Sequence, residues 1–126
     1  RLRSDLVTLC EATLNKTLNS TVAEWEPYSV VGVVLAMEGY PHNYPKHIPI
    51  SGLELPLLEG QKVFHAGTDK KANEIVTSGG RVLCVTGTGD SIKKAQENAY
   101  TTVNKIDWKG KYYRRDIGHR AIAKTS

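Results

Sequence analysis

Apolar side chains recur along this chain with two different spacings, and each spacing predicts one kind of element. Leucines at helical intervals predict an amphipathic helix over residues 2–18. Residues 29–37 are almost continuously apolar and rich in β-branched side chains, which is typical of a strand buried on both faces. Residues 41–61 hold four of the five prolines and have no clear period. They predict a long connection with one short strand near residues 48–50.

Three shorter strands are predicted after this connection, over residues 62–66, 74–77 and 81–86. A polar turn over residues 67–71 follows the first of them. Adjacent glycines supply the positive φ angles that tight turns need. The segment Ser78-Gly79-Gly80 therefore predicts a hairpin between the other two strands.

A second amphipathic helix is predicted next, with Asp90 or Ser91 as its cap. After it, Tyr112-Tyr113 predicts a last short strand before an arginine-rich turn. The expected fold class is α+β: a leading helix, a β-rich body, one packed helix and a basic tail. The apolar face of the packed helix consists of Ile92, Ala95, Ala99, Val103 and Ile106.

The composition is that of one folded domain. The chain has 126 residues, of which 40% are hydrophobic and 24% are charged. No apolar run approaches the roughly 18 residues that span a bilayer, so no membrane contact is expected. Cys10 and Cys84 lie far apart in apolar patterns and predict buried free thiols, which fits a reducing, cytoplasmic compartment. An amphipathic pattern is already under way at Arg1, which predicts a fragment whose beginning lies elsewhere.

The positive charge is concentrated near the end of the chain. Residues 104–126 carry seven basic and two acidic residues, a charge of +5, while the total is +4 and the remainder is therefore −1. Such a local concentration indicates a defined anionic partner such as a phosphate group, which arginine binds through paired hydrogen bonds. Two alternatives stay open: a surface for single-stranded nucleic acid, with tyrosines interleaved among the cations, and an edge strand protected by charge.

Other candidate sites have simpler interpretations. Residues 87–91 run from glycines into a helix and could hold a phosphate, but Asp90 opposes an anion there, so a capped turn is favoured. His42 and His47 lack further ligands, which makes a metal site improbable. His65 is interpreted as a hydrogen-bonded core imidazole. Lys70-Lys71 loosely resembles the modified lysine of biotinyl or lipoyl carrier domains, although a solvated turn is favoured.

Taken in order, several runs resemble the C-terminal region of the glycinamide ribonucleotide synthetases, also called phosphoribosylamine–glycine ligases. Each run is weak alone, but their joint order and spacing are specific and cover almost the whole chain. Residues 42–58 depart from the family pattern. The matching runs are Arg1-Leu2-Arg3-Ser4-Asp5-Leu6, Gly32-Val33-Val34-Leu35-Ala36, Gly39-Tyr40-Pro41, Val63-Phe64-His65-Ala66-Gly67-Thr68, Gly79-Gly80-Arg81-Val82-Leu83, Ala95-Gln96, Ala99-Tyr100 and Tyr113-Arg114-Arg115-Asp116-Ile117-Gly118.

This resemblance implies an ATP-grasp ligase of de novo purine biosynthesis, which joins glycine to 5-phosphoribosylamine through a glycyl phosphate and releases ADP and phosphate. It implies that residues 1–20 are the last helix of the ATP-grasp domain and that residues 21–126 are a small C-terminal domain of the barrel-sandwich type. ATP and Mg²⁺ (or Mn²⁺) would be bound by upstream sequence. The fragment alone, with no catalytic residue and no metal ligand, is expected to be inactive.

The resemblance also implies a substrate site in the basic tail. Arg114, Arg115 and Lys111 are the candidates for binding the ribose 5-phosphate, with Gly118 allowing close approach. Asp116 would orient an arginine. Gly39 and Tyr40 would shape the same cleft. The expected partners are the small-molecule substrates and the upstream domains of the same chain, and a small nucleic-acid-binding module is the alternative function.

Overall fold

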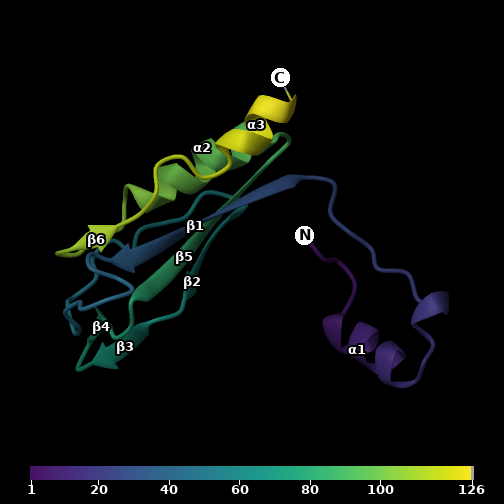
Figure 1. The fold of residues 1–126 in the computed structure, drawn as a ribbon, viewed down its shortest axis with the longest axis horizontal. Helices are drawn as coiled ribbons and strands as arrows, with labels where there is room; N and C mark the ends of the chain where they lie inside the picture. Colours follow the sequence, from purple (N-terminus) through teal and green to yellow (C-terminus); the bar gives the residue numbers. More distant parts are fainter. Residues whose placement is uncertain (126) are drawn as a thin grey trace.

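The computed structural model describes residues 1–125 and confirms the α+β class (Figure 1). The long strand, the packed helix and the three strands predicted over residues 62–66, 74–77 and 81–86 are found close to their expected positions. The elements in chain order are α1 (Leu6–Leu14), a short 3₁₀ helix η1 (Leu18–Ser20), β1 (Ser29–Met37), β2 (Gln61–His65), β3 (Thr68–Lys71), β4 (Glu74–Thr77), β5 (Arg81–Gly89), α2 (Ile92–Val103), β6 (Lys111–Tyr112) and α3 (His119–Thr125).

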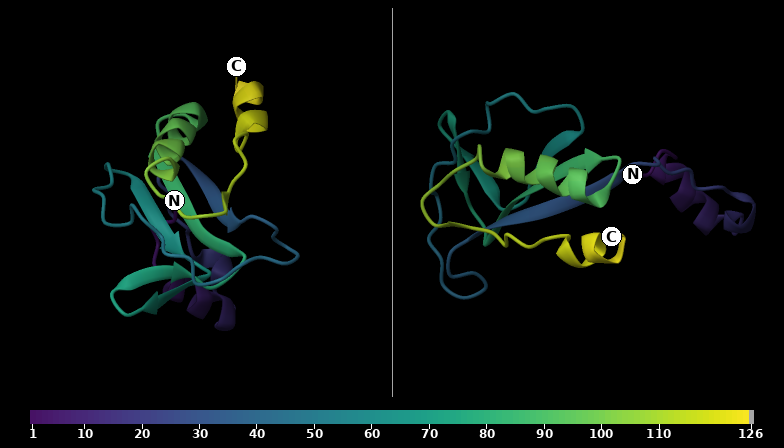
Figure 2. Two further views of the ribbon diagram at one scale, coloured as in Figure 1. Left: turned by 90° about the vertical axis from the view of Figure 1, so that its left-hand side faces the viewer. Right: turned by 90° about the horizontal axis from the view of Figure 1, so that it is seen from above.

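A four-stranded antiparallel sheet in the order β2-β5-β1-β6 forms the body. Helix α2 packs against one face of this sheet (Figure 2). The Ser91 hydroxyl caps the helix by accepting a hydrogen bond from the Lys94 amide at 3.2 Å, which confirms one of the two predicted caps. Small side chains on α2 let it approach β5 closely, and Ala95 and Ala99 are completely buried there.

The opposite face of the sheet is open to solvent among the described residues. Val30, Val34 and Phe64 are 38%, 45% and 51% exposed on this face. The prediction that residues 29–37 are buried on both faces is therefore wrong for the first six of them, where burial alternates. The physical reason is that α2 covers one side of β1, while nothing in residues 1–125 covers the other.

The predicted hairpin at Ser78-Gly79-Gly80 is wrong. Strand β4 pairs with β3 in a separate two-stranded sheet, in the region where a polar turn was expected. The glycines instead serve close packing, since the amides of Ser78 and Gly79 both donate to the Gly67 carbonyl at 2.8 and 3.1 Å. The β3–β4 turn is made by Ala72 (φ 52°) and its neighbour, which carry no glycine signal. A strand near residue 49 reduces to one isolated bridge, Pro49 to Val76.

The first 26 residues form a segment that closes on itself. The Arg3 amide donates to the Glu24 carbonyl at 2.9 Å, and Leu2 pairs with Trp25 in an isolated bridge. Helix α1 is shorter than the predicted residues 2–18, because Asp5 caps its start and Lys16 turns to φ 59°. The segment lies beside the body and α1 stands clear of the sheet (Figure 1).

Three predictions of burial or membrane contact can be compared with the structure. Cys10 lies exposed on α1, so its predicted burial is wrong, while Cys84 is half-buried in β5. His65 is exposed because β2 is an edge strand, and its Nδ1 lies 3.0 Å from the Thr68 hydroxyl. In the described part of the chain, no helix has both the length and the hydropathy to cross a bilayer.

Candidate functional site

Residues 113–118, the basic turn, connect β6 to α3. This turn is organised around Arg114 and Asp116. The Arg114 guanidinium donates two hydrogen bonds to the Asp116 carboxylate, Nε to Oδ1 at 2.9 Å and Nη2 to Oδ2 at 2.6 Å. Both side chains are substantially exposed, 63% and 48% respectively. The carboxylate therefore holds the guanidinium in one orientation at the surface, as predicted for Asp116, and leaves the other guanidinium N–H groups facing solvent.

Helix α2 fixes the backbone of this turn. The Tyr100 hydroxyl donates to the Arg114 carbonyl at 2.6 Å and accepts from the Ile117 amide at 3.2 Å. The Gln96 side-chain amide donates to the Ile117 carbonyl at 2.7 Å. Both residues lie on α2, which packs into the hydrophobic core. The turn is therefore held in place by α2 as well as by hydrogen bonds among its own residues.

Gly118 and the start of α3 complete the turn. Gly118 has φ +88°, a conformation that glycine adopts without strain and that directs the chain into α3. The His119 imidazole follows, with Nδ1 2.6 Å from the Asp116 carbonyl and 3.7 Å from its carboxylate. Helix α3 was not predicted, and it brings His119 and Arg120 back beside Arg114.

A shallow depression of about 360 Å³ lies at this turn. It combines guanidinium groups and an imidazole, which are donors suited to a phosphate ester, with one carboxylate that is paired to Arg114. Arg114, Asp116 and Gly118 of the predicted site residues are brought together here, whereas Arg115 is not among the lining side chains. The lining residues are Arg114, Asp116, Ile117, Gly118, His119, Arg120 and Ala121.

Lys111 is placed differently from the prediction. Its ammonium donates to the Val103 carbonyl at the end of α2 and to the Ile106 carbonyl just beyond it, and lies 3.5 Å from Asp107, with the side chain 13% exposed. It also sits 5.4 Å from the centre of the Tyr113 ring. These contacts stabilise the C-terminus of α2, and Lys111 does not line the depression at the basic turn.

Gly39 and Tyr40 lie at the far end of β1 from Gly118. A Cβ built on Gly118 would meet Val31 near the start of the strand, whereas Gly39 and Tyr40 come just after Met37 at its end. The two ends are about 20 Å apart along the strand. The structure therefore does not bring these two residues into the depression at the basic turn.

Pairing between Arg114 and Asp116 sets the charge of the turn. The side-chain hydrogen bonds from Arg114 hold the pKa of the Asp116 carboxyl below its ordinary value, and the same hydrogen bonds raise the pKa of the Arg114 guanidinium. Asp116 is thus ionised at any pH above the ordinary pKa of aspartate, and the pair is lost only as the pH falls through the lowered pKa.

This pairing gives a direct prediction. In Arg114→Gln the guanidinium is gone, so the pKa of Asp116 should rise toward the ordinary aspartate value. Carboxyl ¹³C NMR of the labelled protein and of the variant measures both midpoints. Equal midpoints in the two proteins would show that the pair does not form in solution.

The other candidate residues have structural placements. Residues 87–89 continue β5 and do not end it, because α2 packs directly on their backbone. Lys70 and Lys71 end β3 at exposed positions beside the turn into β4. Over residues 1–125, no group of three or more histidine, cysteine, aspartate or glutamate side chains is arranged to hold a metal ion.

The family model for the phosphoribosylglycinamide synthetase C domain matches residues 30–120, which include the sheet, α2 and the basic turn. The chain belongs to this family. The resemblance drawn from the sequence is thereby confirmed, and the comparisons give no support to the nucleic-acid-binding alternative.

Several proteins named phosphoribosylamine–glycine ligase match nearly the whole chain. The phosphoribosylamine–glycine ligase of Vibrio vulnificus (strain CMCP6) is 50% identical over 124 residues, and that of Pseudomonas aeruginosa is 54% identical over 125 residues. Each match covers 98% of this chain and 29% of the relative. The crystal structure of phosphoribosylamine–glycine ligase from Thermotoga maritima superposes with a TM-score of 0.65 at 37% identity, covering 89% of this chain and 29% of that one. The chain therefore spans under a third of the length of these relatives.

Proposed function

We propose that this chain is the C-terminal region of a phosphoribosylamine–glycine ligase and forms part of its substrate cleft. The observation that carries the proposal is the identity of about half over 98% of the chain with ligases of that name. The relatives are more than three times as long, so upstream sequence can carry the parts of the active site that this region lacks. The enzyme would act in purine biosynthesis, in the cytoplasm.

In this proposal, ATP and Mg²⁺ (or Mn²⁺) bind to the upstream part of the enzyme, and residues 1–20 are the last helix of its ATP-grasp domain. The exposed leucines of α1 support this assignment, since Leu6 and Leu14 are 63% and 82% exposed and would be covered by upstream chain. The description of residues 21–126 as a C-terminal domain of the barrel-sandwich type belongs to the same proposal.

The basic turn would bind the 5-phosphate of phosphoribosylamine. Arg114, held by Asp116, presents its free N–H groups to the phosphate, while Arg120 and His119 supply further donors from α3. Gly118 leaves the backbone accessible. Arg115 adds positive charge nearby, and Lys111 is assigned to stabilising the end of α2, because its ammonium donates to the Val103 carbonyl.

A coupled assay tests the proposal. The full-length protein that carries this region should form ADP only when phosphoribosylamine, glycine, ATP and Mg²⁺ are all present. The 126-residue chain by itself should give no turnover under the same conditions. ADP formation that does not depend on glycine, or full activity of the isolated chain, would contradict it.

A further inference from the structure

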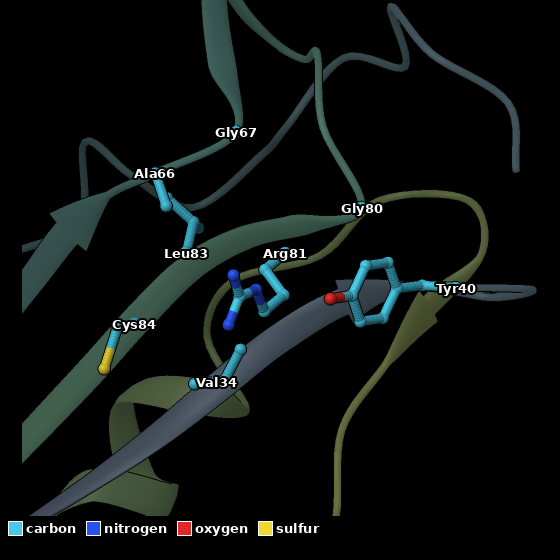
Figure 3. A pocket seen from close by; sticks show the side chains of 8 residues that line it. All are labelled: Val34, Tyr40, Ala66, Gly67, Gly80, Arg81, Leu83 and Cys84. Carbon is cyan, nitrogen blue, oxygen red and sulfur yellow. The ribbon is translucent and has the colours of Figure 1, made fainter. Parts of the chain in front are cut away.

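A second pocket lies on the open face of the sheet, where β1 ends and β5 begins (Figure 3). Its volume is about 510 Å³. Three segments that are distant in sequence meet there: the turn after β1, the turn between β2 and β3, and the start of β5. The lining residues are Val34, Tyr40, Ala66, Gly67, Gly80, Arg81, Leu83 and Cys84.

Backbone contacts fix the shape of this pocket. The Met37 amide donates to the Gly80 carbonyl at 2.7 Å, and the Gly67 amide donates to the Arg81 carbonyl at 2.9 Å. A Cβ on Gly80 would lie 2.1 Å from the Tyr40 ring, and one on Gly67 would lie 2.6 Å from the Arg81 carbonyl. The glycines are therefore needed for the packing that presents Tyr40 and Arg81 side by side.

The pocket contains one charged side chain among those that line it, Arg81. In Figure 3 the Arg81 guanidinium and the Tyr40 hydroxyl point toward the same open space above Val34. Neither group has a hydrogen-bond acceptor or an ion pair among the described residues, and the lining includes no carboxylate. Burial raises the pKa of the Cys84 thiol, which keeps this neighbour uncharged. The donors therefore face an apolar wall with no internal acceptor.

We propose that Arg81 and the Tyr40 hydroxyl form an oxyanion-binding site for a substrate of the ligase. The inference rests on the proposed function and names a site separate from the basic turn. A guanidinium binds a carboxylate or a phosphate through two parallel hydrogen bonds, and a neighbouring hydroxyl adds a third donor. Glycine brings a carboxylate to the reaction, and phosphoribosylamine brings a phosphate, which the proposed function assigns to the basic turn and which cannot occupy both sites. The two sources share this chemistry and are separated by experiment.

Kinetics of the full-length protein test this site. Arg81→Gln removes the charge and keeps a polar side chain, and Tyr40→Phe removes the hydroxyl while the ring still covers Gly80. Arg81→Gln should raise the KM of one oxyanion substrate about tenfold or more, with the KM of ATP unchanged. Tyr40→Phe should raise the same KM by a smaller factor. Lys70→Gln, an exposed cation outside the pocket, is the matched control and should change each KM less than about twofold.

Some outcomes identify the ligand of this site, and others overturn the proposal. A selective rise for glycine identifies the carboxylate. A selective rise for phosphoribosylamine identifies the phosphate and overturns its assignment to the basic turn. Unchanged KM values for both substrates would overturn the site. An equal rise for all three substrates together with a lower melting temperature would also overturn it, since Arg81 would then pair with a carboxylate of the upstream chain.

A binding measurement separates failure of this site from failure of the proposed function. Calorimetric titration of the full-length protein with glycine and with ribose 5-phosphate requires no turnover. If the protein lacks ligase activity, the proposed function fails, and weaker binding of either probe to Arg81→Gln still supports the site. Equal binding by both proteins would remove it.

Discussion

Gly87→Ala should destabilise the folded domain by about 3 kcal/mol or more, a large effect for the addition of a single methyl group. Gly87 is buried in β5, and a Cβ there would lie 2.3 Å from the Ala99 amide nitrogen and 2.7 Å from the Ala95 carbonyl. Both are backbone atoms of α2, so they cannot move aside without shifting the whole helix. Chemical denaturation of the variant measures the free energy of unfolding.

Gly32→Ala is the matched control, because Gly32 lies on the adjacent strand β1. Its Cβ would point to the open face and lie 3.4 Å from Cys84 Sγ, close to ordinary contact. Its free energy of unfolding should change by less than about 1 kcal/mol. Similar losses in both variants would mean that the close approach of α2 to β5 does not determine stability.

Simultaneous replacement of Arg114 and Arg120 by alanine should raise the KM of phosphoribosylamine by about 100-fold in the full-length enzyme, with the KM of ATP near normal. In the proposed site each guanidinium would contribute charge-assisted hydrogen bonds to the phosphate, and Asp116 could not replace them because it is ionised. Steady-state kinetics with each substrate varied in turn gives the three KM values.

Arg3→Ala provides the control for this double variant. Arg3 pairs with Glu26 at 3.4 Å in the N-terminal segment, so its loss removes a surface cation that does not line the depression at the basic turn. All three KM values should stay near normal in it. A double variant that behaves like this control would exclude the basic turn from phosphate binding.

Strong periodicity made the central elements predictable. Strand β1 matches the predicted residues 29–37, and α2 begins after Ser91 as expected, because long apolar patterns outweigh local exceptions. The pairing of the strands was harder to predict. Two adjacent glycines are expected in a hairpin turn and also where two chain segments pack closely, and Gly79 and Gly80 are of the second kind. Helix α3 has seven residues, too few for a visible period.

The candidate site was predictable only in part. Arg114, Asp116 and Gly118 follow one another in sequence, so one motif indicates all three. His119 and Arg120 join them through α3, which the pattern did not reveal. Arg81 belongs to one of the runs that resemble the family but was not predicted as a site residue, because its pocket is assembled by pairing of β5 with β1 and by a turn 41 residues upstream, at Tyr40.

The crystal structure of the full-length protein with glycinamide ribonucleotide bound tests the central claim most directly. We predict that the 5-phosphate of this product lies within hydrogen-bonding distance of Arg114 and Arg120, with Asp116 still paired to Arg114. A phosphate held entirely by residues outside the turn between β6 and α3 would contradict the account.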